Sequence, residues 1–428
     1  MISGPLAYRH TISPRPRDVN YDEAQVPGFT LPEPLLAADG RRVQSADDWL
    51  RLRRPELLDL FESQVYGRAP RASHVQVDQV SRDSSALSGF ATRLELDVRV
   101  KPEPSSANAL VLRVLLWLPN HARVPAPIFL GLNDFGNQTV HPDPAIRLAE
   151  GWVPNDEALG LHEYAASDAS RGLLARRWPL EMLLARGYGL ATLYAGDVDP
   201  DYDDGFRNGA HGLFRTHSEA ERAPDAWGSI GAWAWGLSRA LDALSTVERV
   251  DPRRVGVIGH SRFGKAALWA GAQDARFAWV ISNNSGHAGA ALARRRFGEL
   301  TRHLNLRFPH WFAQNFRAYD DKESALPVDQ HELLALIAPR PVYVASAADD
   351  LWADPRGELL SCLNASPVYE LLGLQGLRLE GTAPALNQSV GDSIGYHCRP
   401  GGHDLLAADW WHYLNFAERH GNRFERTR

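Results

Sequence analysis

Hydrophobic residues follow different spacings in the first and later parts of the chain. Apolar residues recur at helical spacing from about residue 46 to Phe61, and Ser45 stands where a helix N-cap is expected. Apolar and polar residues then alternate over 75–80, 91–100 and 110–118. This alternation predicts antiparallel strands at the edge of a sheet.

From residue 127 onward, short apolar runs alternate with helical segments. The runs predict buried strands, and they cover 127–133, 188–194, 255–259, 277–282, 341–347 and 394–398. Helical spacing predicts helices over 178–184, 226–247, 329–337 and 406–420. Such alternation indicates the α/β class, with a mostly parallel central sheet covered on both faces as a three-layer αβα sandwich.

Other stretches lack a periodic pattern. Residues 134–176, 196–224 and 376–396 are rich in Gly, Asp, Pro and Asn, and inserted loops of this length are usually functional. Residues 1–44 are Pro-rich, so we expect an extended segment that packs on the body. Since no linker is evident, residues 45–428 are expected to form a single catalytic domain.

Composition excludes several classes of protein. The 428 residues are 44% hydrophobic and include 13 Trp, which is enough for a large core. A net charge of −6 with both signs interspersed argues against a nucleic-acid partner. No apolar run approaches the roughly 18 residues of a membrane span. The first five residues show no signal-peptide pattern, and Cys362 and Cys398 are expected to be free and buried.

A strand, a sharp turn and a helix are predicted around Ser261. The apolar run 255–259 leads to Ser261, and a helical pattern follows over 266–272. This is the form of a nucleophile elbow, in which the helix N-terminus offers N–H groups to an oxyanion. The spacing Gly259-x-Ser261-x-x-Gly264 departs from the usual G-x-S-x-G. The alternative is a Gly-rich connection in which Ser261 only caps the helix.

A nucleophilic serine needs a base and a carboxylate. Of the histidines after Ser261, His403 has the expected setting, because two glycines precede it in a loop before the last helix. The alternative is a surface His in a capping loop. Strand 341–347 ends at Asp349 and Asp350, which local sequence does not separate, whereas Asp354 precedes Pro355 and is expected to cap a helix. No pattern of metal ligands is evident, so we expect neither a metal nor a cofactor.

The elbow resembles that of carbohydrate esterase family 15, the glucuronoyl esterases, and of its bacterial members in particular. The family motif is G-C-S-R-x-G-K, and residues 259–265 read G-H-S-R-F-G-K, with His260 in place of the Cys. The resemblance extends over most of the chain from about residue 40, through motifs at 177–181, 196–200, 282–286, 294–299, 309–312, 326–331 and 350–355.

This resemblance implies an α/β-hydrolase fold and a function in the degradation of plant biomass. The expected reaction is hydrolysis of esters between (4-O-methyl) glucuronic acid side chains of glucuronoxylan and lignin alcohols, the esters of lignin–carbohydrate complexes. The implied roles are Ser261 as nucleophile, His403 as base and Arg262 as oxyanion stabiliser, with Lys265, Glu299 and Trp352 at the sugar site. The resemblance also implies a secreted or periplasmic enzyme, and we expect a monomer.

The triad acid is the point at which the chain departs from the fungal members. They carry a Glu in a Q-E-S-G stretch, which here reads N-N-S-G with Asn284 at that position. Some bacterial members use an Asp on the later strand, and alignment on Trp352 favours Asp350, with Asp349 second. We therefore predict a Ser-His-Asp triad that acts through an acyl-enzyme, and little contribution from Asn284.

Two other functions remain as alternatives at this point. One is another carbohydrate or general carboxylesterase, such as an acetyl xylan esterase. The other is a noncatalytic glycan-binding relative. The natural alcohol and the preference between glucuronate and galacturonate are left open by the sequence.

Overall fold

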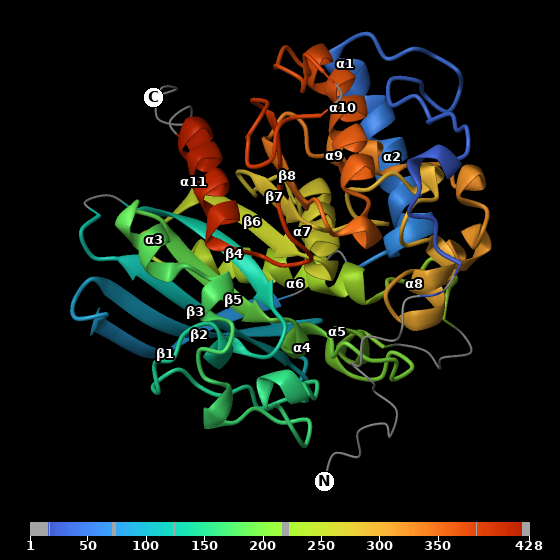
Figure 1. Cartoon of the computed structure of the whole chain (residues 1–428). Coiled ribbons are helices and arrows are strands. Elements are labelled where there is room, and N and C mark those ends of the chain that lie inside the picture. The colour runs from blue at the N-terminus through green and yellow to red at the C-terminus, as the bar shows by residue number, and fades with distance from the viewer. Residues whose placement is uncertain are drawn as a thin grey trace. The chain divides into compact units, whose positions relative to one another are not determined.

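The computed structural model describes residues 16, 18–70, 74–122, 125–215, 222–381 and 383–421. They divide into two compact units. The first, called here the strand unit, holds the described residues of 69–222 and 232–256. The second, the elbow unit, holds those of 16–68, 223–231 and 257–421 (Figure 1). The single catalytic domain over 45–428 stays a prediction.

The strand unit begins with the three predicted antiparallel strands. They pair in sequence order and are β1 (His74–Ala86), β2 (Ala91–Lys101) and β3 (Leu110–Pro119). β5 (Gly189–Tyr194) then pairs antiparallel with β3 and parallel with β4 (Ala126–Asn133). The helices assigned to this unit are α3 (Leu180–Ala185), α4 (Ala195–Val198), α5 (Gly209–Leu213) and most of α6 (Ser229–Leu244).

The elbow unit holds consecutive parallel strands. β6 (Val250–His260) begins in the strand unit and ends in the elbow unit. Its last residues pair with β7 (Val280–Asn283), β7 pairs with β8 (Val342–Ala347), and β8 pairs with β9 (Ile394–Arg399). Because parallel strands end at the same edge of a sheet, the loops that follow β6, β7, β8 and β9 lie together there.

Helices of the elbow unit confirm some predictions and correct others. The predicted helices are present as α1 (Ala46–Asp48), α2 (Arg54–Phe61), α7 (Arg262–Gln273), α9 (Gln330–Ala335) and α11 (Ala407–Gly421). The pattern did not predict α8 (Thr301–Arg307), and it placed no bounds on α10 (Pro355–Leu371). In α8 only Leu304 and Leu306 are apolar, and they are not at helical spacing. α10 contains Pro367, a residue that usually ends a helix.

The described part of the predicted extended segment lies along the elbow unit. Asn20 accepts a backbone hydrogen bond from Gly298 (2.9 Å), and Pro32 is bonded through its carbonyl to the imidazole of His331 (2.9 Å). The helix that follows begins at Ser45, whose side chain accepts a hydrogen bond from the Asp48 amide (3.1 Å), as predicted. Residues 1–15 lie outside the described part of the chain.

No helix within the described residues has both the length and the apolar character needed to cross a membrane. In the same residues, no group of three or more His, Cys, Asp and Glu side chains is arranged to hold a metal ion.

Candidate active site

Ser261 lies in a strained turn between β6 and α7. Its φ of 58° and ψ of −128° are unfavourable for a residue with a side chain. The turn is held by a hydrogen bond from the Ser261 amide to the carbonyl of Asn283 at the end of β7 (2.9 Å). The sharp strand-to-helix turn is therefore present as predicted, and Ser261 stands at the N-terminus of α7.

Both glycines of the unusual spacing are required by close packing. A Cβ added at Gly259 would lie 1.9 Å from the carbonyl oxygen of Phe263, so no side chain fits. A Cβ added at Gly264 would lie 2.8 Å from the Cβ of Ser285 in the loop after β7. The second glycine therefore follows Ser261 by three residues because the first turn of α7 packs on that loop.

His403 and Asp350 are in direct contact. Nδ1 of His403, in the loop after β9, lies 2.6 Å from Oδ2 of Asp350, in the loop after β8. Asp350 is 1% exposed, whereas Asp349 is exposed and bonds to Gly401 through its backbone amide (3.0 Å). Asp354 accepts a hydrogen bond from the Gly357 amide (2.9 Å) and caps α10, as expected. The geometry thus favours Asp350 as the carboxylate behind His403.

Asn284 lies against the same carboxylate. Its Nδ2 donates a hydrogen bond to Oδ2 of Asp350 (2.9 Å), and both side chains are buried. The backbone of Asn284 has a positive φ of 47°, which Asn tolerates better than most residues. Sequence reasoning missed this contact, because there the residue was judged only as a lost carboxylate.

His260, where the chain departs from the family motif, lies beside the candidate base. The ring centroids of His260 and His403 are 4.6 Å apart. Nδ1 of His260 is bonded to Oδ1 of Asn283 (2.6 Å), and Nδ2 of Asn283 donates to the hydroxyl of Tyr413 on α11 (2.8 Å). The substitution in the motif was the only sequence signal for this contact.

Arg262 follows Ser261 directly and begins α7. Its guanidinium lies over the ring of Phe263, with 4.7 Å between the guanidinium carbon and the ring centroid. The side chain is partly exposed. The residue predicted to stabilise the oxyanion is therefore at the helix terminus next to the candidate nucleophile.

The three predicted sugar-site residues are close to one another. Nζ of Lys265 donates to the carbonyls of Ser285 (2.5 Å) and His287 (2.7 Å), and it lies 4.0 Å from Oε2 of Glu299. Burial lowers the pKa of Lys265 and raises that of Glu299, and each of the two opposite charges counters the shift of the other. Glu299 also accepts a hydrogen bond from the Trp352 side chain. These contacts join α7, the segment before α8 and the loop after β8.

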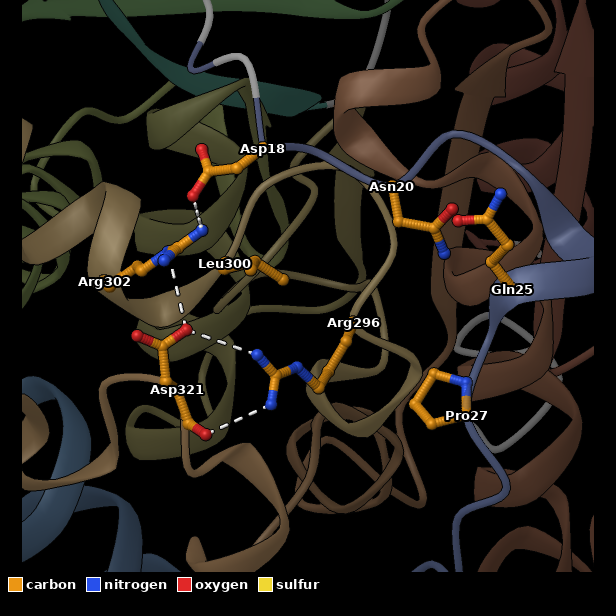
Figure 2. A pocket seen from close by; sticks show the side chains of 8 residues that line it. All are labelled: Asp18, Asn20, Gln25, Pro27, Arg296, Leu300, Arg302 and Asp321. Atoms are coloured by element: carbon orange, nitrogen blue, oxygen red, sulfur yellow. Dashed lines mark hydrogen bonds and ion pairs between the residues drawn. The ribbon is translucent and has the colours of Figure 1, made fainter.

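A separate polar pocket of about 380 Å³ includes Leu300 in its lining. Figure 2 shows ion pairs that run from Asp18 to Arg302, to Asp321 and to Arg296. The lining residues are Asp18, Asn20, Gln25, Pro27, Arg296, Leu300, Arg302 and Asp321. None of the predicted site residues lines this pocket. The ion pair between Asp18 and Arg302 connects the N-terminal segment to α8.

A second buried carboxyl group lies behind the candidate triad. Glu358 on α10 accepts a hydrogen bond from the Gly286 amide (2.9 Å) and is bonded to the Ser346 hydroxyl (2.5 Å). Burial raises the pKa of Glu358 to about 8, and the charge of nearby Asp350 adds to the shift. Glu358 is therefore mostly protonated at neutral pH and joins the loop after β7 to the end of β8 as a neutral group.

The raised pKa of Glu358 makes stability depend on pH. A carboxyl whose pKa is higher in the folded state stabilises that state at low pH, and this contribution is lost as the pH rises towards about 8. We expect wild type to lose a few kcal/mol of unfolding free energy between pH 5 and pH 8 relative to Glu358→Gln. Urea denaturation at several pH values measures this, with Glu370→Gln on the same helix as control. Parallel curves for wild type and Glu358→Gln would contradict it.

Comparisons with known proteins agree on one family. A family model described as "Glucuronyl esterase, fungi" matches residues 209–373. Carbohydrate esterase MZ0003, from an unknown prokaryotic organism, is 47% identical over 95% of this chain and 93% of its own. The solved structure of a promiscuous CE15 esterase from a marine bacterial metagenome is 46% identical, with a TM-score of 0.87 over 94% of this chain and 100% of that one. The chain belongs to carbohydrate esterase family 15, the glucuronoyl esterases.

A further solved structure supports the same assignment. The glucuronoyl esterase from Solibacter usitatus is 46% identical to this esterase, with a TM-score of 0.86 over 93% of this chain and 99% of that one. The α/β-hydrolase fold implied by the resemblance is thereby confirmed, and the protein is a serine carboxylic ester hydrolase. The family model spans Ser261 and Asp350 but ends before His403, so the contact between His403 and Asp350 is the independent observation on the base.

Proposed function

We propose that this glucuronoyl esterase hydrolyses the ester between (4-O-methyl) glucuronic acid side chains of glucuronoxylan and lignin alcohols, with Ser261, His403 and Asp350 as its triad. The observation that carries the proposal is the 2.6 Å contact between His403 and the buried Asp350. That pair belongs to loops at the sheet edge where the elbow also ends. Membership of family 15 supplies the class of substrate.

The reaction proceeds in two steps. Oγ of Ser261 attacks the uronoyl carbonyl while Nε2 of His403 takes its proton, and the alcohol leaves with that proton. Water then attacks the acyl-enzyme with His403 again as base, and glucuronate is released. Asp350 holds Nδ1 of His403 and stabilises the imidazolium, whereas Arg262 and the helix N-terminus stabilise the oxyanion.

The sugar is held by Lys265, Glu299 and Trp352. Two of the three N–H groups of Lys265 already bind backbone carbonyls, which leaves one to be directed at a sugar hydroxyl. The carboxyl oxygens of Glu299, which lie near Lys265 and Arg307, can accept hydrogen bonds from sugar hydroxyls. The hydrogen bond from Trp352 to Glu299 supports a positioning role for this Trp.

The class of acyl group is tested by comparing two esters. We expect wild type to hydrolyse benzyl glucuronate far better than p-nitrophenyl acetate. Lys265→Met, which keeps the buried chain length, should lower kcat/KM for benzyl glucuronate by about 10- to 100-fold, because the charged hydrogen bond to the sugar is lost together with those to the carbonyls of Ser285 and His287. Turnover of the acetate should change little. Hydrolysis of the acetate without that of the glucuronate ester would contradict the proposal and favour an acetyl or general esterase.

A broader ester specificity is the second candidate, because the solved relative from the marine metagenome is described as promiscuous. In that case the same triad would also act on simple esters, which the acetate assay detects. We also propose that the enzyme acts as a monomer and is secreted or periplasmic, since an insoluble wall polymer does not enter a cell.

A further inference from the structure

The carboxylate of Glu299 lies between two cations without a hydrogen bond to either. Its Oε2 is 4.0 Å from Nζ of Lys265, and its Oε1 is 3.7 Å from Nη1 of Arg307. Both distances exceed the roughly 3.2 Å limit of an N–H···O bond. Glu299 is only 6% exposed, so these two gaps lie in a largely enclosed place.

Gaps of this width suit hydroxyl groups. A hydroxyl can donate to a carboxylate and at the same time accept from a cation. Two hydrogen bonds of about 2.8 Å that meet near a right angle join groups about 4 Å apart. Each oxygen of Glu299 faces one such gap, and two oxygens of one carboxylate are matched by two hydroxyls on neighbouring carbons of a sugar.

Arg307 is held in a way that leaves its donors available. It is the last residue of α8, and its side chain is 27% exposed. Within the described part of the chain, its side chain donates no hydrogen bond. Its guanidinium instead lies over the rings of Phe308 (5.0 Å) and Trp352 (5.6 Å), and stacking on a ring face leaves the N–H edge available.

The two rings beneath Arg307 are themselves fixed. Phe308 stacks on Trp311 with centroids 3.7 Å apart and planes 3° from parallel. Trp352 packs against the His303 ring (5.5 Å) and is bonded to Glu299. A guanidinium placed on a rigid support is preorganised, which reduces the entropy lost when it binds a ligand.

We propose that Arg307 is a specificity-determining residue that binds, together with Glu299, a second hydroxyl of the uronate ring, next to the one bound by Lys265 and Glu299. This inference rests on the proposed function, because it takes the uronate ester as the ligand. With this residue, the enzyme recognises two hydroxyls on neighbouring carbons of the acyl part of the substrate. Esters whose acyl part lacks these hydroxyls gain nothing from Arg307.

The test compares Arg307→Met with wild type on benzyl glucuronate and on p-nitrophenyl acetate. We expect KM for benzyl glucuronate to rise about 10-fold with a smaller change in kcat, and the kinetics on the acetate to stay unchanged. Arg307→Lys should recover part of the loss. On a benzyl glucuronate analogue that lacks the second hydroxyl, wild type and Arg307→Met should be equal.

Arg302→Met is the matched control, since Arg302 is the arginine of α8 at the separate polar pocket and pairs with Asp18 and Asp321 (Figure 2). It should leave benzyl glucuronate kinetics unchanged, and melting temperatures of all variants report folding. The inference is overturned if Arg307→Met loses activity equally on both esters. It is also overturned if a folded Arg307→Met keeps the wild-type KM for benzyl glucuronate. Failure of wild type itself on benzyl glucuronate would instead overturn the proposed function.

Discussion

Ser261→Ala is expected to lower kcat for benzyl glucuronate by at least about 10³-fold, because no other group replaces the nucleophile. The fold should survive, since alanine meets the same strain as serine at a φ of 58°. Saponification of benzyl glucuronate, followed by release of benzyl alcohol, measures the loss. Activity close to that of wild type would remove Ser261 from the mechanism.

A second substitution at this position separates catalysis from stability. Ser261→Gly also lacks the hydroxyl, but glycine adopts a positive φ without strain. We therefore expect Ser261→Gly to be as inactive as Ser261→Ala and more stable by about 1 kcal/mol. Thermal or urea unfolding of the two variants checks this difference. If the more stable of the two variants were also clearly the more active, the loss of activity would result from a change in structure and not from the loss of the nucleophile.

Asp350→Asn should reduce kcat by roughly 10²- to 10⁴-fold, because an amide neither fixes the tautomer of His403 nor balances the charge of the imidazolium. Kinetics on benzyl glucuronate measure the effect. Asp349→Asn is the matched control, since Asp349 is the neighbouring residue, has the same chemistry and is exposed. If Asp349→Asn were the damaging change, the assignment of the acid would be wrong by one residue.

Asn284 completes this series of variants. Its amide donates to Oδ2 of Asp350, so Asn284→Ala should cost about one hydrogen bond to a charged group and lower kcat roughly 10-fold. Asn284→Asp would place a second carboxylate 2.9 Å from the first. Two carboxyls at that distance share a proton at neutral pH, so the pH profile of kcat should move to higher pH. An unchanged profile would show that the two side chains do not act together.

Much of the fold could be predicted from spacing alone. Period-two alternation located the three antiparallel strands, and short apolar runs located β4 to β9 to within a few residues. These signals are reliable because burial of one face or of a whole strand constrains every residue along it. α8 was missed because only Leu304 and Leu306 of its seven residues are apolar, and they are not at helical spacing. A helix after Asp354 was expected, but its bounds were not predicted, and α10 contains Pro367.

The part of the candidate site that lies within one local motif could be predicted from the sequence. Residues 259–265 contain the nucleophile, the proposed oxyanion arginine and the lysine of the sugar site in one strand-turn-helix segment. The spacing of Gly259 and Gly264 was visible in the sequence, but its reason was not. That reason is the packing of α7 on the loop after β7, which brings Gly264 to the Cβ of Ser285.

The class of fold, the elbow with Ser261, the family and a loop histidine suited to be the base could all be inferred from the amino-acid sequence. Which aspartate contacts His403, and that Asn284 and His260 lie beside this pair, became evident from the folded chain. The tertiary structure also placed Glu299 between Lys265 and Arg307. The physical reason is that periodicity and motifs report how a segment relates to its own neighbours. Contacts between loops that are far apart in the chain, such as those of Asp350 with His403 53 residues away and with Asn284 66 residues away, depend on the order in which the strands pair.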